Sequence, residues 1–163
     1  MSPEEAVAGQ YPGDPEFEPT ALPSGVTVPR SQGCTGGTCV PLTIPCDAKG
    51  CNISPDMVKR LEGMHNQAKV AGARVTEAMP PSRAHKSSCH YNGTCIDYSK
   101  SGGMNGAEVK RVVDAAFANG LRPVYEVKTQ AQKDALVSAG VPAANIKVLG
   151  DWISAPHFSI YGY

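Results

Sequence analysis

The chain has 163 residues, of which 41% are hydrophobic. That is enough for one domain with a substantial core and too little for two domains of ordinary size. Fifteen basic residues balance fifteen acidic ones, so the charge gives no indication of nucleic acid as a partner. No run of about 18 apolar residues is present, and we therefore expect no membrane-spanning segment.

Residues 1–33 differ in composition from the rest of the chain. They hold six prolines, and five acidic residues against one basic residue, without any apolar periodicity. Such a segment cannot bury enough surface to fold alone. We interpret 1–33 as an extended, proline-rich arm or linker and 34–163 as the folded domain. The domain is mildly cationic, which would suit an anionic cell-wall polymer but is also typical of an ordinary solvated surface.

Six cysteines form three close pairs, each with glycine inside a short loop: Cys34/Cys39, Cys46/Cys51 and Cys89/Cys95. The even number and the turn-bearing spacing predict three local disulfides and an oxidising compartment, so we expect a secreted or cell-surface protein. The alternative is a structural zinc site built from the first two pairs, although their spacing is at the wide limit for such modules.

The first regular elements are expected after the second cysteine pair. Ser54 and Pro55 are typical of a helix start. Apolar residues then follow at helical spacing: Met57, Leu61, Met64 and Ala68. Strands are expected over 73–79 and 94–98, separated by a loop that contains His90.

The second half of the domain continues the same mixed pattern. An apolar stripe predicts a helix over 106–119, and a strand follows over 122–127. Thr129 and Gln132 form a capping box for a helix ending near Ala139. Strands over 146–149 and 158–161 complete an α+β fold, in which a central antiparallel sheet is flanked by helices.

A candidate metal site depends on residues that are far apart in the sequence. His90 and Asp97 lie seven residues apart around Gly93, and His157 lies sixty residues beyond Asp97. Catalytic zinc takes three protein ligands and keeps a fourth position open. A surface histidine in a polar loop, with an aspartate at a strand end, is the plainer interpretation of the same residues.

The motif resembles a known zinc signature. Ser88-x-His90-x-x-Gly93, followed by a small residue and Asp97, is similar to the pattern of the D-Ala-D-Ala carboxypeptidase family and of the hedgehog signalling domain that shares its fold. Further similarity lies in three segments: Arg74-Val75-Thr76-Glu77, Val124-Tyr125-Glu126 and His157-Phe158-Ser159. The resemblance covers roughly residues 54–163. It implies a hedgehog/D-Ala-D-Ala peptidase-like fold with zinc held by His90, Asp97 and His157.

The chain departs from this family at the general base. The carboxypeptidases carry a glutamate three residues before the last histidine, where this chain has Ser154. The hedgehog arrangement places the glutamate at the end of the preceding strand, which corresponds best to Glu126. Asp151 is nearer to His157 in sequence but off the family spacing. We favour Glu126, because a strand end beside the metal can bring a base within hydrogen-bond reach.

The resemblance also implies a substrate and its contacts. Ser88 corresponds to a substrate-binding serine, and Arg83 or Arg74 to the arginine that binds the peptide's terminal carboxylate. The expected function is that of a zinc-dependent peptidase or carboxypeptidase acting on peptidoglycan stem peptides. One alternative is a catalytically inactive zinc-binding module for cell-wall or protein interaction. Another is a structural exported domain in which the histidines and the aspartate never meet.

Overall fold

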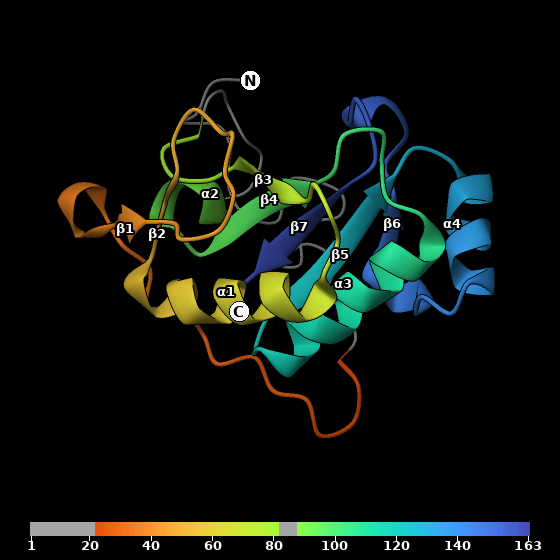
Figure 1. The fold of residues 1–163 in the computed structure, drawn as a ribbon, viewed down its shortest axis with the longest axis horizontal. Coiled ribbons are helices and arrows are strands. Elements are labelled where there is room, and N and C mark those ends of the chain that lie inside the picture. The colour runs from red at the N-terminus through yellow and green to blue at the C-terminus, as the bar shows by residue number, and fades with distance from the viewer. Residues whose placement is uncertain (1–21, 82–87) are drawn as a thin grey trace.

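The computed structural model describes residues 22–81 and 88–163. Within these ranges it contains a five-stranded mixed sheet, a sheet of two short strands and four α-helices (Figure 1). The large sheet has the order β3-β4-β7-β5-β6. Its strands are β3 (Arg74–Glu77), β4 (Cys95–Ser99), β5 (Arg122–Val127), β6 (Ile146–Val148) and β7 (His157–Tyr161). The predicted α+β class and the five predicted strands are thereby confirmed.

The sheet is not wholly antiparallel, so that part of the prediction was wrong. β4 pairs antiparallel with β3 and β7, and β7 pairs antiparallel with β5, but β6 runs parallel to β5. A parallel neighbour needs a crossover connection, which helix α4 (Gln130–Ser138) supplies here. β5, α4 and β6 therefore form a strand–helix–strand unit at one end of the sheet.

Two helices, α1 (Val58–Ala68) and α3 (Gly106–Ala118), lie together across one face of the sheet (Figure 1). Their predicted apolar stripes are buried against alternate residues of the strands. This face contributes the main core. Its fully buried members include Leu61, Met64, Val109, Val112, Val113, Ile96, Tyr98, Phe158 and Ile160.

Side-chain capping hydrogen bonds are present at the starts of α3 and α4 but not at the start before α1. A 3₁₀ turn, Pro55–Met57, precedes α1, and Ser54 occupies its N-cap position. The capping box predicted for α4 is present, with Thr129 accepting a hydrogen bond from the Gln132 backbone N–H. A second box, formed by Asn105 and Glu108, caps α3.

The described end of the predicted arm lies against the body of the domain. Arg60 Nη1 donates to the Pro29 carbonyl at 2.6 Å. Asp56 accepts from the Ser31 hydroxyl at 2.5 Å and from the Gln32 N–H at 2.6 Å. Burial raises the pKa of Asp56, but these hydrogen bonds outweigh it and hold the pKa below its usual value. The part of the predicted arm before residue 22 is outside the described residues.

The three predicted disulfides, Cys34–Cys39, Cys46–Cys51 and Cys89–Cys95, are all formed. Their sulfur atoms are bonded to one another, which removes the thiolates that a structural zinc site would need. The sequence did not predict the small sheet of β1 (Val40–Pro41) and β2 (Asn52–Ile53), whose strands directly follow the first and second disulfide loops. Three disulfides are compatible with an extracellular protein.

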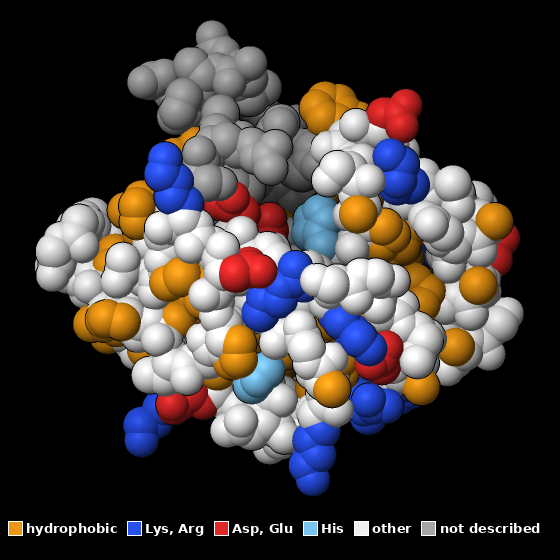
Figure 2. Space-filling model, turned by 45° about the horizontal axis from the view of Figure 1, so that its top comes forward, with side chains coloured by type: hydrophobic (Ala, Val, Ile, Leu, Met, Phe, Trp, Pro, Cys, Tyr) orange, Lys and Arg blue, Asp and Glu red, His pale blue; other side chains and the backbone are white. Residues whose placement is uncertain are grey.

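The described helices include none that is long and apolar enough to span a membrane. In the view of Figure 2, basic and acidic side chains are interspersed, without a continuous patch of one sign. This surface gives no sign of the single-signed field that draws a protein to a polyanion.

Candidate metal centre

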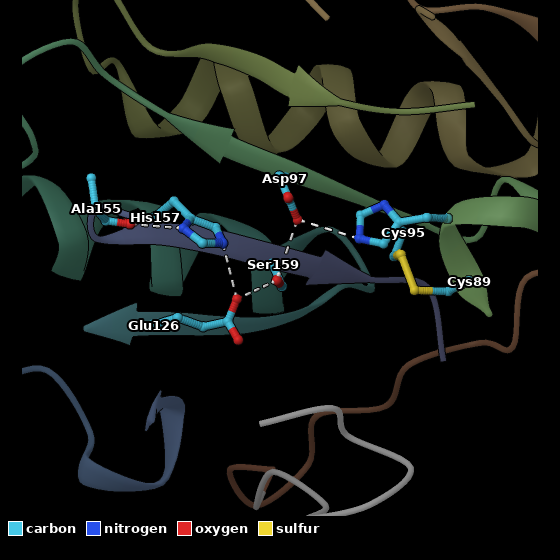
Figure 3. A network of polar contacts seen from close by, with 8 residues as sticks. Cys89, Cys95, Asp97, Glu126, Ala155, His157 and Ser159 are labelled. Carbon is cyan, nitrogen blue, oxygen red and sulfur yellow. Dashed lines mark hydrogen bonds and ion pairs between the residues drawn. A yellow bond between two sulfur atoms is a disulfide. The ribbon is translucent and has the colours of Figure 1, made fainter. Parts of the chain in front are cut away.

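The face of the sheet opposite α1 and α3 carries a cluster of polar side chains. Asp97 of β4 pairs with Ser159 of β7, and Glu126 of β5 pairs with His157 of β7. Side chains alternate along a strand, so these four project to the opposite side from Phe158 and the main core. Figure 3 shows the four side chains converging over β7.

His90 reaches the same cluster from a short helix, α2 (Cys89–Asn92), where the sequence predicted only a loop. Gly93 follows in the left-handed region with φ of 72°, and the chain then turns back into β4. A Cβ on Gly93 would lie 2.5 Å from Cys34 Sγ, so both conformation and space require glycine. The Cys89–Cys95 disulfide closes this turn, and His90 is buried within it.

Four distances define the cluster. His90 Nε2 lies 3.4 Å from Asp97 Oδ1, and His157 Nε2 lies 3.1 Å from Glu126 Oε1. Ser159 Oγ lies 2.8 Å from Glu126 Oε1 and 3.4 Å from Asp97 Oδ1. Ser159 therefore joins the two acid–imidazole pairs into one network.

The environment of His157 favours its charged form in the absence of metal. Burial lowers the pKa of this imidazole. The hydrogen bond with Glu126 and the charges of Asp97 and Glu126 act in the opposite direction and raise the pKa to about 9. His157 Nδ1 also lies 2.9 Å from the Ala155 carbonyl, which accepts its proton. That bond assigns Nε2 as the nitrogen that faces the cluster, as in histidines that bind metals through one nitrogen and a backbone carbonyl through the other.

Glu126 is the most deeply buried acid of the cluster, with 2% of its surface exposed. Its Oε1 contacts both Ser159 and His157, whereas Oε2 is buried and has no hydrogen-bond partner in the described part of the chain. A buried carboxylate oxygen without a partner carries a desolvation cost. An ordered water, a bound ion or a catalytic role is the usual explanation for such a group.

The donor set of His90, Asp97 and His157 suits a zinc ion in its chemistry, but in the described part of the chain its ligand atoms do not all lie within 4.8 Å of one another. Two ligands at about 2.1 Å from a tetrahedral ion lie about 3.4 Å apart, which is the separation of His90 Nε2 and Asp97 Oδ1. His157 would complete a set of two imidazoles and one carboxylate only if its Nε2 turned from Glu126 toward that pair. Its Nε2 proton would have to leave, because only neutral imidazole binds metal.

A second group of potential ligands includes the same histidine. Among the described residues, the three whose ligand atoms lie within 4.8 Å of one another are Cys89, His90 and Cys95. Such a group can hold a metal ion when its sulfurs are thiolates. Here both sulfurs belong to a disulfide, so His90 is the member of the group with a donor atom available.

The structure separates the two candidate bases. Glu126 contacts His157 directly, whereas Asp151 is fully exposed and lies 3.6 Å from Lys128 Nζ. Ser154, at the position of the carboxypeptidase glutamate, is also exposed.

The candidate substrate-binding residues are distributed differently. Ser88 is half-buried at the start of α2, two residues before His90. Arg74 binds Asp47 through Nε at 2.8 Å. Arg83 lies outside the described residues.

Sequence reasoning did not assign any role to Ser159. The signal was present, because Ser159 follows His157 by two positions in a predicted strand and must share its face. The pairing of β7 with β5, which brings Glu126 to the same hydroxyl, could not be predicted from the sequence.

Comparison of the chain with family models, curated proteins and solved structures finds no match. The resemblance to zinc peptidases therefore depends on the motif residues alone.

Proposed function

We propose that the chain is a zinc-dependent peptidase that cleaves peptidoglycan stem peptides. One observation carries the proposal. His90, Asp97 and His157 come from two segments sixty residues apart, yet they belong to one network of buried and half-buried side chains that also contains a glutamate. Two imidazoles, a carboxylate and an adjacent acid form the kind of donor set that hydrolytic zinc sites use.

The residues take distinct roles in this proposal. His90, Asp97 and His157 would hold the zinc, which would polarise the scissile carbonyl and activate water. Glu126 is the general base, because its carboxylate lies beside His157, with Oε1 on the side of the proposed ligands. Ser88, beside His90, contacts the peptide. The stem-peptide substrate follows from the motif's resemblance to the D-Ala-D-Ala carboxypeptidases, and export to the cell surface follows from the disulfides.

The direct test is digestion of purified muropeptides, followed by mass spectrometry. The zinc-loaded protein should release a fragment whose mass identifies the bond cleaved. Chelator should abolish the product, and added zinc should restore it. Zinc bound at one ion per chain without any product would reject hydrolysis of these peptides.

The second candidate is a zinc-binding module that lacks catalysis. Exposed Ser154 at the place of the carboxypeptidase glutamate favours this alternative. So does the unit of α4 and β6, which is inserted between Glu126 and His157. Such a module should bind muropeptides in a zinc-dependent manner and return them uncut, an outcome that the same digestion detects.

A further inference from the structure

Ser159 occupies the centre of the polar network. It lies on β7, the middle strand of the sheet, and only 5% of its surface is exposed. Its backbone pairs with Asp97 on one side and with Val124, two residues before Glu126, on the other. Figure 3 shows its hydroxyl between the two carboxylates. A serine in this position touches both the proposed ligand and the proposed base.

A hydroxyl has one proton, so it can donate to only one of the two acids at a time. The distance to Glu126 Oε1 is 2.8 Å, near the optimum for an O–H donor, whereas the distance to Asp97 Oδ1 is 3.4 Å. The proton therefore goes to Glu126. Hydrogen bonds to a carboxylate are stronger than neutral ones, and this one is buried.

Metal binding increases the importance of this hydrogen bond. Without metal, Glu126 Oε1 is held by both Ser159 and His157. If His157 turned its Nε2 toward a zinc ion, it would no longer contact Glu126 Oε1. Asp97 would share its oxygen with the same ion and would be a poorer acceptor for the Ser159 hydroxyl. The hydrogen bond from Ser159 would then be the contact that still holds Glu126 Oε1.

From this geometry, which rests on the proposed zinc site, we infer that Ser159 is a positioning residue that fixes the general base once the metal is bound. Its hydroxyl holds Glu126 Oε1 on the side of the carboxylate that faces His157 (Figure 3). The serine does not contact substrate or metal itself. Its contribution is a hydrogen bond that keeps the Glu126 carboxylate in one orientation when Asp97 and His157 bind the metal.

Three substitutions separate this role from simple packing. Ser159→Ala removes the hydroxyl and leaves the remaining atoms in place. Ser159→Thr keeps it on a residue that suits a strand, and Ser159→Cys replaces it with a weak donor of similar size. Ser99→Ala is the matched control, since Ser99 ends β4 outside the network. If the threonine methyl destabilises the protein, the serine, cysteine and alanine series still carries the test.

The kinetic expectation is specific. With zinc affinity unchanged within about threefold, Ser159→Ala should lower kcat for muropeptide hydrolysis about 10- to 100-fold, which corresponds to one lost hydrogen bond to a charged group. KM should stay within about twofold. Ser159→Thr should recover most of kcat, with Ser159→Cys between threonine and alanine. A kcat in Ser159→Ala equal to that of wild type would overturn the inference.

A structural readout keeps the test independent of hydrolysis. Crystal structures of the zinc-loaded wild type and Ser159→Ala should show Glu126 in one conformer in the former and in several, or turned away, in the latter. The same single Glu126 conformer in both proteins would overturn the inference even if the enzyme is active. Conversely, a displaced Glu126 in a protein that cuts no peptide would reject the proposed function and leave the role of Ser159 standing.

Discussion

The two faces of the large sheet differ in composition, since one is apolar and covered by helices and the other carries a polar network. On one face, Ile96, Tyr98, Phe158 and Ile160 are fully buried under α1 and α3. On the other, their sequence neighbours Asp97, His157 and Ser159 form a network with Glu126. Successive residues of β4 and β7 therefore belong alternately to the apolar core and to the polar network.

The arrangement makes the core a rigid support for the site. A protein interior is close-packed and does not deform continuously, so strands anchored on one face hold the side chains of the other in fixed positions. A small satellite cluster, which includes Cys89, Cys95, Val124 and Tyr161, lies on the polar face and supports the turn that carries His90. Substitutions on adjacent residues should consequently produce separable defects.

The largest effect is expected for the base. Glu126→Gln keeps the size of the side chain but cannot accept the proton, so kcat should fall about 10²- to 10⁴-fold. Zinc content should remain one ion per chain. Asp151→Asn, at an exposed carboxylate, is the matched control and should leave kcat unchanged. A larger loss in Asp151→Asn than in Glu126→Gln would reassign the base.

Removing a ligand should come next in size. His157→Ala should weaken zinc binding by at least about 100-fold, beyond the 10- to 100-fold typical for loss of an outer hydrogen-bond partner. Competition with a chromophoric chelator measures the change. His65→Gln is the control on the other face, where His65 Nδ1 lies 2.6 Å from the Tyr98 hydroxyl. Equal zinc affinity in wild type and His157→Ala would remove His157 from the site.

Substitutions of two neighbouring residues on β4, one on each face of the sheet, should separate an effect on stability from an effect on zinc binding. Ile96→Ala should lower the free energy of unfolding by about 2–5 kcal/mol, as is usual when a fully buried aliphatic side chain is truncated. Zinc affinity of the folded fraction should be preserved. Asp97→Asn should do the reverse, with a small change in the denaturation midpoint of the metal-free protein and a large loss of zinc affinity. Denaturant titrations with and without zinc distinguish the two patterns.

The smallest effect concerns pH. The pKa of His157 is raised to about 9, so its contact with Glu126 stabilises the metal-free fold fully below the ordinary value near 6.5 and is lost as pH rises through 9. Zinc binding has the opposite dependence, because the ion must displace that proton. Apparent zinc affinity should therefore rise about tenfold per pH unit up to about 9. Calorimetry in buffers of different ionisation enthalpy should detect one proton released.

The helix-covered face was the easier one to predict from sequence. Met57, Leu61 and Met64 recur at helical spacing, and all are fully buried. The start of α4 was fixed by the Thr129 capping box. Apolar periodicity and a capping box both involve residues that are close in the sequence, so they can be predicted without knowledge of the rest of the chain.

The polar face was harder to predict, because its contacts join distant segments. The motif around His90 placed Asp97 on a returning strand, as found. Neither the parallel pairing of β6 nor the meeting of Ser159 with Glu126 has a local signal, since both depend on the order of strands in the sheet. Pairing across 33 residues is set by tertiary packing, which single-residue preferences do not encode.

The three disulfides have a consequence for how the chain can be produced. Each joins a cysteine to the next one along the chain, across separations of five or six residues. Closure of such short loops is rapid, and six cysteines otherwise permit about fifteen connectivities. The native disulfides are thus also the ones that form most readily, because each joins the two cysteines that are closest along the chain. We expect fully reduced protein to regain it in a simple glutathione buffer, without an isomerase to correct mispaired species.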